Sequence, residues 1–134
     1  MDDCIFCKIV KGEIPCEKIW EDGSFLAFLD IRPSIEGMTL VIPKKHLSSK
    51  IFKNEDAIIN NLMSAAKKVS LLLEKSFDID RVAALFEGME VDHLHMKLYP
   101  LKAGTSIKMF LTEEGAIPTE GELHSTALKI REIR

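Results

Sequence analysis

The sequence has 134 residues, a length typical of one domain and sufficient to bury a hydrophobic core. Its 18 basic and 21 acidic residues give a net charge of -3, so the chain offers no broad cationic surface for nucleic acid. No apolar run approaches the roughly 18 residues of a membrane span, and the acidic start Met1–Cys4 leaves no room for a signal peptide. We therefore expect a cytoplasmic protein with no membrane partner and one domain over residues 1–134, its core at about 4–111 and a tail at 112–134.

Three cysteines, an odd count, lie within the first sixteen residues, which argues against a disulfide scaffold and for a reducing compartment. Cys4 and Cys7 form a Cys-x-x-Cys pair in a short helix that is expected to close near Gly12. This pair alone is compatible with a redox dithiol, half of a zinc site, or chance. Redox pairs of this type normally follow a strand, and none precedes Cys4. Cys16 matches no motif and is expected to be a small core or surface residue.

The segments 18–21 and 25–29 predict a β-hairpin that turns at Asp22-Gly23, a dipeptide typical of tight turns. Asp30 follows the end of the second strand. Residues 37–43 predict a third strand, which ends at a proline because proline cannot donate a hydrogen bond to the ladder. The strand is followed by a basic turn of Lys44, Lys45 and His46. For the two lysines, exposure to solvent is the simplest interpretation.

Apolar residues recur at steps of three and four between residues 54 and 77, which is the period of an amphipathic helix. Asn54 fits the N-cap, and Glu55 and Asp56 fit the first turn, where the helix dipole favours acidic side chains. The apolar stripe carries no catalytic residue type, so we expect this helix to cover one face of a sheet. Its members are Ile58, Leu62, Ala65, Ala66, Val69, Leu72 and Leu73.

The apolar segment 81–86 predicts a central fourth strand, and a turn at 87–90 makes it the antiparallel neighbour of the segment 91–100. In that last segment polar and apolar residues alternate over six positions, as in a strand with two different faces. Positions two apart are separated by about 6.6 Å, so the polar face fits one extended ligand or two adjacent sites. A solvated strand face is the simpler alternative. The apolar positions are Leu94, Met96 and Leu98, and the polar positions are His93, His95 and Lys97.

The pattern weakens after residue 100. Residues 107–111 are a candidate strand, and Thr119 or Glu120 begins a terminal helix. His124 in that helix has no partner nearby in the sequence and is expected to be exposed without a role. These elements predict an α+β fold: an antiparallel meander sheet of about five strands, a long amphipathic helix packed on it, and short N- and C-terminal helices.

Five blocks of the sequence stand in a characteristic order: Cys4-Ile5-Phe6-Cys7-Lys8-Ile9, Glu13-Ile14-Pro15, Phe28-Leu29-Asp30-Ile31-Arg32-Pro33, the run from Gly37 to His46, and His93-Leu94-His95. Together they resemble the histidine-triad superfamily, nucleotide hydrolases and nucleotidyl transferases that act at the α-phosphate of a nucleotide. The likeness spans about three quarters of the chain, from Cys4 to Pro100. The defining pattern of that family is His-x-His-x-His followed by two apolar residues. Here the third position is Lys97.

The resemblance implies that the middle histidine, His95, is the nucleophile. A neutral imidazole near pH 7 can attack phosphorus and leave again, which splits one displacement into two easier ones. The resemblance also implies that Asp30 accepts hydrogen bonds from the ribose hydroxyls and that apolar residues hold a purine base. For these apolar residues, packing in the hydrophobic core is an equally good interpretation as lining a base pocket. They are Phe6, Ile9, Ile14, Phe28 and Ile31.

Zinc-bearing branches of the superfamily bind the metal with four residues that match Cys4, Cys7, His46 and His93. Two thiolates and two imidazoles form a closed, tetrahedral structural zinc site, which would tie the N-terminus to the histidine segment. Unpaired buried thiols are the alternative. Many relatives are symmetric dimers, so the resemblance also implies a homodimer.

The sequence departs from the family at three positions. Lys97 is a fixed point charge, so it attracts phosphate but leaves protonation of the leaving group open. Phe86 and Glu90 stand near positions where hydrolases of the family carry an amide and a small hydroxyl residue. We predict an enzyme that forms a nucleotidyl intermediate on His95 from a purine nucleotide conjugate and passes the nucleotide to water or another acceptor. A non-catalytic nucleotide-binding or regulatory module that keeps the fold and the zinc is the alternative. A zinc-dependent redox protein that uses Cys4 and Cys7 is a weaker third hypothesis.

Overall fold

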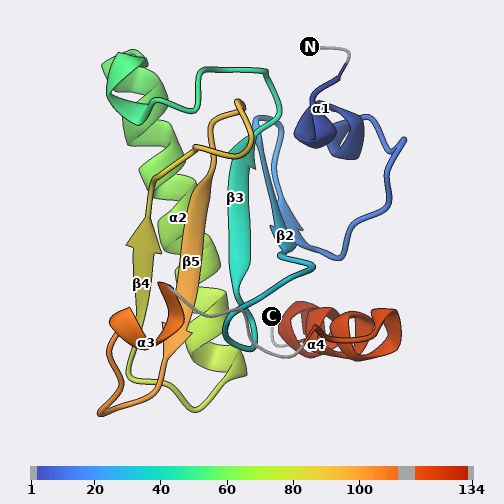
Figure 1. The fold of residues 1–134 in the computed structure, drawn as a ribbon, viewed down its shortest axis with the longest axis vertical. Helices are drawn as coiled ribbons and strands as arrows, with labels where there is room; N and C mark the ends of the chain where they lie inside the picture. The colour runs from blue at the N-terminus through green and yellow to red at the C-terminus, as the bar shows by residue number, and fades with distance from the viewer. Residues whose placement is uncertain (1–2, 112–116, 133–134) are drawn as a thin grey trace.

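The computed structural model describes residues 3–111 and 117–132. Within this part of the chain, five antiparallel strands form one sheet in the order β1-β2-β3-β5-β4 (Figure 1). The predicted α+β fold is confirmed. The strands are β1 (Lys18–Glu21), β2 (Phe25–Leu29), β3 (Thr39–Pro43), β4 (Arg81–Leu85) and β5 (Met96–Leu101), and the helices are α1 (Ile5–Val10), the short 3-10 helix η1 (Ile51–Lys53), α2 (Asp56–Ser76), α3 (Lys108–Leu111) and α4 (Glu120–Glu132).

The two faces of the sheet are covered by different helices, because alternate residues of a strand point to opposite sides. In β2, Ala27 and Leu29 pack with the apolar stripe of α2 in the main core. Leu26 and Phe28 point to the other side and pack with Phe6 of α1. Figure 1 shows α2 running behind the sheet and α1 beside the ends of β2 and β3. In the described part of the chain the second face is thus covered only by short elements, α1 over β2 and β3 and α3 with Phe110 over β4 and β5.

The hairpin between β1 and β2 forms as predicted. One carboxylate oxygen of Asp22 accepts hydrogen bonds from the backbone N–H groups of Ser24 and Phe25, each at 2.8 Å. An aspartate that accepts bonds from residues two and three ahead stabilises a tight turn. After the sheet's third strand, Lys44 pairs with Glu21 at 3.0 Å and Lys45 is exposed, which confirms the solvated basic turn.

The prediction that residues 81–86 form a central strand is wrong. β4 lies at the edge of the sheet, because β5 inserts between β3 and β4. The apolar run indicates burial on both faces, but its side chains are only partly buried or exposed. Ala83 and Ala84 are small enough to occupy an edge without exposing much apolar surface. The antiparallel pairing of β4 with β5 is as predicted.

Two local predictions for the helices need correction. Asn54 does not cap α2: the cap is Glu55, which makes no side-chain capping bond, while Asn54 Nδ2 donates to the carbonyls of Ser48 and Lys50 at 3.0 and 3.1 Å. Asn54 thus stabilises the turn that precedes the helix. The strand predicted over residues 107–111 is wrong, because Lys108–Leu111 form the helical turn α3 and the N–H groups of Met109 and Phe110 donate to the carbonyls of Ser106 and Ile107.

The terminal helix α4 begins as predicted. Thr119 and Glu122 form a reciprocal capping box, with the Thr119 N–H 3.0 Å from Glu122 Oε1 and the Glu122 N–H 3.1 Å from Thr119 Oγ1. The helix buries Ala127 in the main core. His124 is not without a partner, since its Nδ1 lies 3.0 Å from Glu17 Oε2.

The predicted boundary between core and tail, at 111 and 112, falls at the edge of residues 112–116, which lie outside the described residues. The expectation of a single domain over 1–134 stays a prediction. None of the helices in the described part of the chain combines the length and apolar character needed to cross a membrane.

Candidate functional site

The segment that carries the two alternating histidines is a strand only in its second half, because β5 begins at Met96. The predicted strand over residues 91–100 is therefore wrong in its first half. The backbone there is bonded outside the sheet: the N–H of Leu94 donates to the carbonyl of Leu47 at 2.9 Å. The predicted apolar positions are buried as expected: Leu94, Met96 and Leu98.

Four side chains with donor atoms that suit transition metals come together from three parts of the chain. Cys4 caps α1 and Cys7 lies in its first turn, whereas His46 follows β3 and His93 precedes β5. We call these four residues the Cys2His2 cluster. Cys7 Sγ lies 3.2 Å from His46 Nδ1 and 3.5 Å from His93 Nδ1, and Cys4 Sγ lies 3.4 Å from His93 Nδ1. The four donor atoms all lie within 4.8 Å of one another.

These distances fit a metal ion at the centre of the cluster. Tetrahedral zinc has Zn–S bonds of about 2.3 Å and Zn–N bonds of about 2.0 Å, which separate two ligand atoms by roughly 3.3–3.8 Å. His93 is also oriented for this role, because its Nε2–H donates to the carbonyl of Pro43 at 2.8 Å and leaves the Nδ1 lone pair toward the thiols. Burial raises the pKa of Cys7 and the adjacent Cys4 thiol raises it further, so a bound cation would be needed to favour the thiolates.

A cavity of about 320 Å³, which we call the cleft, lies between α1, the segment that follows β2, and the loop 87–90. Met89 and both glutamates of this loop contribute to its wall. The structure brings to the cleft every residue that the sequence predicts for catalysis or nucleotide binding. These are Phe6, Ile9, Ile14, Phe28, Asp30, Ile31, His95 and Lys97.

His95 is buried in the wall of the cleft with its ring fixed in one orientation. Its Nδ1 lies 2.7 Å from the carbonyl oxygen of His93, and since a carbonyl only accepts, Nδ1 carries the proton and Nε2 keeps its lone pair. Burial lowers the pKa of His95, against the hydrogen bond to His93, and the charge of Lys97 lowers it further. The ring of Phe6 packs edge-on against it at a centroid distance of 5.2 Å. The side chain is thus held as a neutral imidazole with one free nitrogen.

Asp30 stands at the end of β2, where one carboxylate oxygen accepts the N–H of Arg32 at 2.8 Å. Its own N–H donates to the carbonyl of Met38 at 3.0 Å, which fixes the backbone. Among the described residues no hydrogen bond occupies the second oxygen, Oδ2. A carboxylate with one oxygen anchored and one available suits a ligand that offers hydroxyl groups.

The HIT domain family matches residues 11–104 of the chain. The chain belongs to this family. Among curated proteins, the adenosine 5'-monophosphoramidase hnt1 of Schizosaccharomyces pombe is 39% identical over 98 residues, which are 72% of this chain and 73% of that protein. The resemblance to the histidine-triad superfamily is confirmed.

Solved structures agree with the family assignment. A HIT-like protein involved in cell-cycle regulation from Bartonella henselae aligns with a TM-score of 0.82 at 30% identity and covers 100% of this chain and 98% of that chain. A Zn-bound histidine triad family protein from Mycobacterium smegmatis aligns with a TM-score of 0.79 at 24% identity, over 98% and 93% of the two chains. At that identity the second alignment shows the shared fold.

In this HIT protein the residues that depart from the family pattern lie in different places. Phe86 packs against the main core and does not line the cleft, whereas Glu90 does. Glu87 and Met89 line the cleft too, although nothing in the sequence distinguishes them from ordinary turn residues. Cys16, predicted as a small core or surface residue, is half-buried in the same wall.

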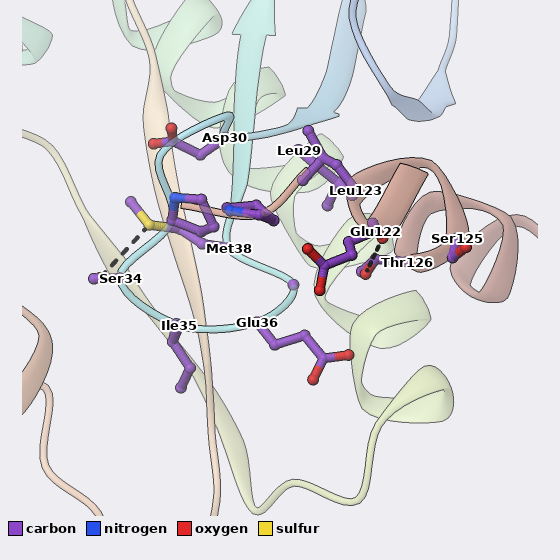
Figure 2. A pocket seen from close by; sticks show the side chains of 13 residues that line it. Leu29, Asp30, Ser34, Ile35, Glu36, Met38, Glu122, Leu123, Ser125 and Thr126 are labelled. Atoms are coloured by element: carbon purple, nitrogen blue, oxygen red, sulfur yellow. Dashed lines mark hydrogen bonds between the residues drawn. The ribbon is translucent and has the colours of Figure 1, made fainter. Parts of the chain in front are cut away.

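A larger cavity, of about 500 Å³, lies between the loop after β2 and the N-terminal half of α4. Figure 2 shows its acidic side chains, among them Glu36 and Glu122, and the hydrogen bond from Thr126 Oγ1 to the carbonyl of Glu122. Of the predicted site residues only Asp30 reaches it. Among the described residues that line it there is no histidine, lysine or arginine, so this cavity is the larger one but the cleft holds the side chains suited to phosphate chemistry.

Proposed function

We propose that this HIT protein is a nucleotide hydrolase or nucleotidyl transferase that acts at the α-phosphate of a purine nucleotide conjugate, through a covalent intermediate on His95. The observation that carries the proposal is the buried His95 ring, which is locked by the His93 carbonyl with its unprotonated nitrogen free. The name of the fission-yeast relative, adenosine 5'-monophosphoramidase, supports a conjugate joined through a phosphoramidate.

The reaction takes two displacements at phosphorus. His95 Nε2 attacks the α-phosphorus, an N–P bond forms, and the bond to the leaving nitrogen or oxygen breaks with its electron pair on the leaving group, which takes up a proton. Water or another acceptor then attacks phosphorus and loses a proton, and the N–P bond breaks to restore neutral His95. Lys97 attracts the phosphate as a fixed cation.

The rest of the cleft binds the nucleotide. Apolar side chains enclose the purine base, and the free oxygen of Asp30 accepts the ribose hydroxyls. Phe6 and Phe28 pack edge to face with centroids 5.7 Å apart, which gives the base pocket a rigid aromatic corner. The other apolar members of this pocket are Ile9, Ile14 and Ile31.

The Cys2His2 cluster holds a structural zinc ion in this proposal. Its support is the set of two thiols and two imidazoles whose donor atoms lie within 4.8 Å of one another, and a Zn-bound family member shares the fold. Bound zinc would supply a cross-link between α1, the end of β3 and the segment before β5. Elemental analysis of protein purified without chelator tests it, with about one zinc per chain expected and no zinc as the contrary result.

We infer a symmetric homodimer, in the cytoplasm, built from one domain per chain. The outer side of β4 has no partner strand in the described part of the chain, and a groove of about 450 Å³ beside it is lined by Met63, Ala84 and Lys67. An edge strand next to an apolar groove is a surface that pairs readily with a second copy. Light scattering of the purified protein should give twice the chain mass; the chain mass alone at micromolar concentration would contradict the dimer.

The decisive experiment for the chemistry is intact-mass analysis after incubation with adenosine and guanosine phosphoramidates. We expect a transient nucleotidyl adduct on the wild type and on His124→Ala, a control histidine on α4, but not on His95→Ala. Binding without any adduct or turnover across purine nucleotides would instead support the second candidate, a nucleotide-binding or regulatory module. Lys97 at the third triad position is the observation that favours this candidate.

A further inference from the structure

The loop 87–90 is held by one residue that lies far from it in the sequence. The buried Ser49 donates its Oγ–H to the carbonyl of Gly88 at 2.9 Å and its backbone N–H to Asp92 Oδ1 at 3.1 Å. Just beyond, the Leu94 N–H donates to the Leu47 carbonyl. The segment that follows His46 is therefore hydrogen-bonded both to the middle of the loop and to the residues just after it.

Close packing fixes the loop as well as hydrogen bonds do. Gly88 has a backbone φ of +75°, which residues other than glycine rarely adopt. A Cβ added to it would lie 2.7 Å from Ser49 Cβ and 2.8 Å from the Ser49 carbonyl oxygen. No larger residue fits there without moving backbone. The loop thus has a defined position at the cleft rather than the freedom of an ordinary surface turn.

This fixed loop makes the cleft acidic where the chemistry is proposed. Glu87 and Glu90 line the same cavity as His95 and Lys97. With Asp30 the lining has three carboxylates against two cations, Arg32 and Lys97. Since Asp30 is assigned to the ribose, the two glutamates are the carboxylates that a leaving group would meet.

We propose that the loop 87–90, held by Ser49, is an acidic wall that selects the leaving group by its charge. Among phosphoramidates, conjugates whose amine carries a positive end group are preferred over neutral ones, and neutral ones over negatively charged ones. This inference rests on the proposed function and names the residues that set the preference among its substrates.

The charge change in the first displacement explains the selection. When the α-phosphorus–nitrogen bond breaks, its electron pair stays on nitrogen, which takes a proton from water and leaves as a neutral or cationic amine. When the leaving group is a phosphate, the same electron pair adds negative charge to a group that is already anionic. Beside two carboxylates, that charge is repelled.

The test uses adenosine 5'-phosphoramidates that differ only in the end group of the amine: 2-aminoethyl, 2-hydroxyethyl and 2-carboxyethyl, with ADP as the phosphate-releasing member. We expect kcat/KM to fall in that order, by about fivefold for each added negative charge at low salt, and the steps to shrink at about 0.5 M salt. The double variant Glu87→Gln/Glu90→Gln should flatten the series. Glu74→Gln, on the exposed side of α2, removes a carboxylate outside the cleft and should leave the ranking as in the wild type. Steps in kcat/KM as large in the double variant as in the wild type, or no dependence of kcat/KM on charge, would overturn the proposal.

Ser49→Ala tests whether the wall must be held in place. It deletes the hydroxyl that donates to the Gly88 carbonyl. We expect the ratios of kcat/KM between compounds of different charge to become severalfold smaller. Ser48→Ala is the matched control, because the Ser48 hydroxyl only accepts the N–H of Lys50, at 3.1 Å. Thermal unfolding checks that both variants fold. If Ser49→Ala does not fold, the salt dependence of the wild-type ranking still decides the proposal.

The same compounds separate failure of the wall from failure of the chemistry. If no compound is turned over, the proposed function fails, and calorimetric Kd values for the series then judge the wall alone. Tighter binding of the aminoethyl compound, lost in the double variant, supports the wall without catalysis. Equal Kd values for all end groups would overturn it.

Discussion

The Cys2His2 cluster and the cleft are neighbours that share one short segment of chain but differ in construction. In the cluster, the four donor atoms of two thiols and two imidazoles from three parts of the chain lie within 4.8 Å of one another. In the cleft, an imidazole, an arginine, a lysine and three carboxylates line an open cavity together with apolar side chains. The cluster is built to be closed and the cleft to admit a ligand.

His93 joins the two regions. Its side chain belongs to the cluster and its carbonyl orients the ring of His95 at 2.7 Å. Phe6 makes a second link, because it lies between the two cysteines on α1 and its ring packs against both histidines, at centroid distances of 5.8 and 5.2 Å. Loss of the cluster should therefore disturb the cleft through both His93 and Phe6, whereas substitutions in the cleft should leave the cluster intact.

The largest effects are expected from substituting the two histidines separately. His95→Ala should reduce kcat/KM for an adenosine phosphoramidate by at least about a thousandfold, because the proposed nucleophile is lost, and leave zinc content and thermal unfolding almost unchanged. His93→Ala should lose the zinc and about 3 kcal/mol of unfolding free energy, since metal binding contributes to folding. Zinc analysis and denaturant unfolding of both variants provide the measurement. Loss of zinc in His95→Ala would contradict the division between the regions.

Replacing Lys97 should have the next largest effect and should be confined to the cleft. Lys97→Gln removes the cation that attracts the phosphate, and a hydrogen bond to a charged group contributes enough to expect a loss of about thirtyfold in kcat/KM, mostly through KM. Lys45→Gln is the control, because Lys45 is exposed in the basic turn beyond the cleft. A loss in kcat alone would mean that Lys97 acts in proton transfer instead.

The sequence predicts the membership of both regions better than the way in which they are held. Cys4, Cys7, His46 and His93 are matched through the family resemblance, because ligand identity and spacing are local features of the chain. The cleft residues follow for the same reason. The strand predicted over 91–100 fails because its first half bonds to Leu47, a tertiary partner that no local pattern reveals.

The loop 87–90 shows the same limit at the site itself. Glu87 and Glu90 have the composition of a solvated turn, and their place at the cleft depends on Ser49, 39 residues before Gly88. β4 is a further case: an apolar run signals burial on both faces, but which strand lies at the edge depends on where β5 inserts. Such features depend on the complete fold and cannot be inferred from neighbouring residues.

Removing the metal should weaken nucleotide binding through Phe6. Without zinc, α1 loses its anchors at Cys4 and Cys7, and the aromatic corner of the base pocket loosens. We expect the Kd for AMP to rise about tenfold after chelation, which corresponds to the loss of one good aromatic contact. Titration calorimetry before chelation, after it, and after zinc is restored measures the change. The same Kd in all three states would show that the cleft is independent of the cluster.

The smallest effect is expected at the surface ion pairs beside the cluster. Glu21, at the end of β1, pairs with Lys18 at 2.6 Å and with Lys44, which follows β3 two residues before His46, at 3.0 Å. The hydrogen bond from Lys18, followed by that from Lys44, lowers the pKa of Glu21 below its ordinary value of 4.5. A lowered carboxyl pKa stabilises the folded state above pH 4.5, and this contribution is lost as the pH falls below that value.

Because Glu21 is partly exposed, with 40% of its side chain accessible, solvent screens the pair, and Glu21→Gln should lower the unfolding free energy by less than about 1 kcal/mol at pH 7. The difference from the wild type should vanish towards pH 3 and in high salt, as measured by urea unfolding. Zinc content should not change, because the donors of the cluster are positioned by α1, the Pro43 carbonyl and the segment before β5. A variant that folds but loses its zinc would show that the surface pair, and not the buried framework, holds His46 in place.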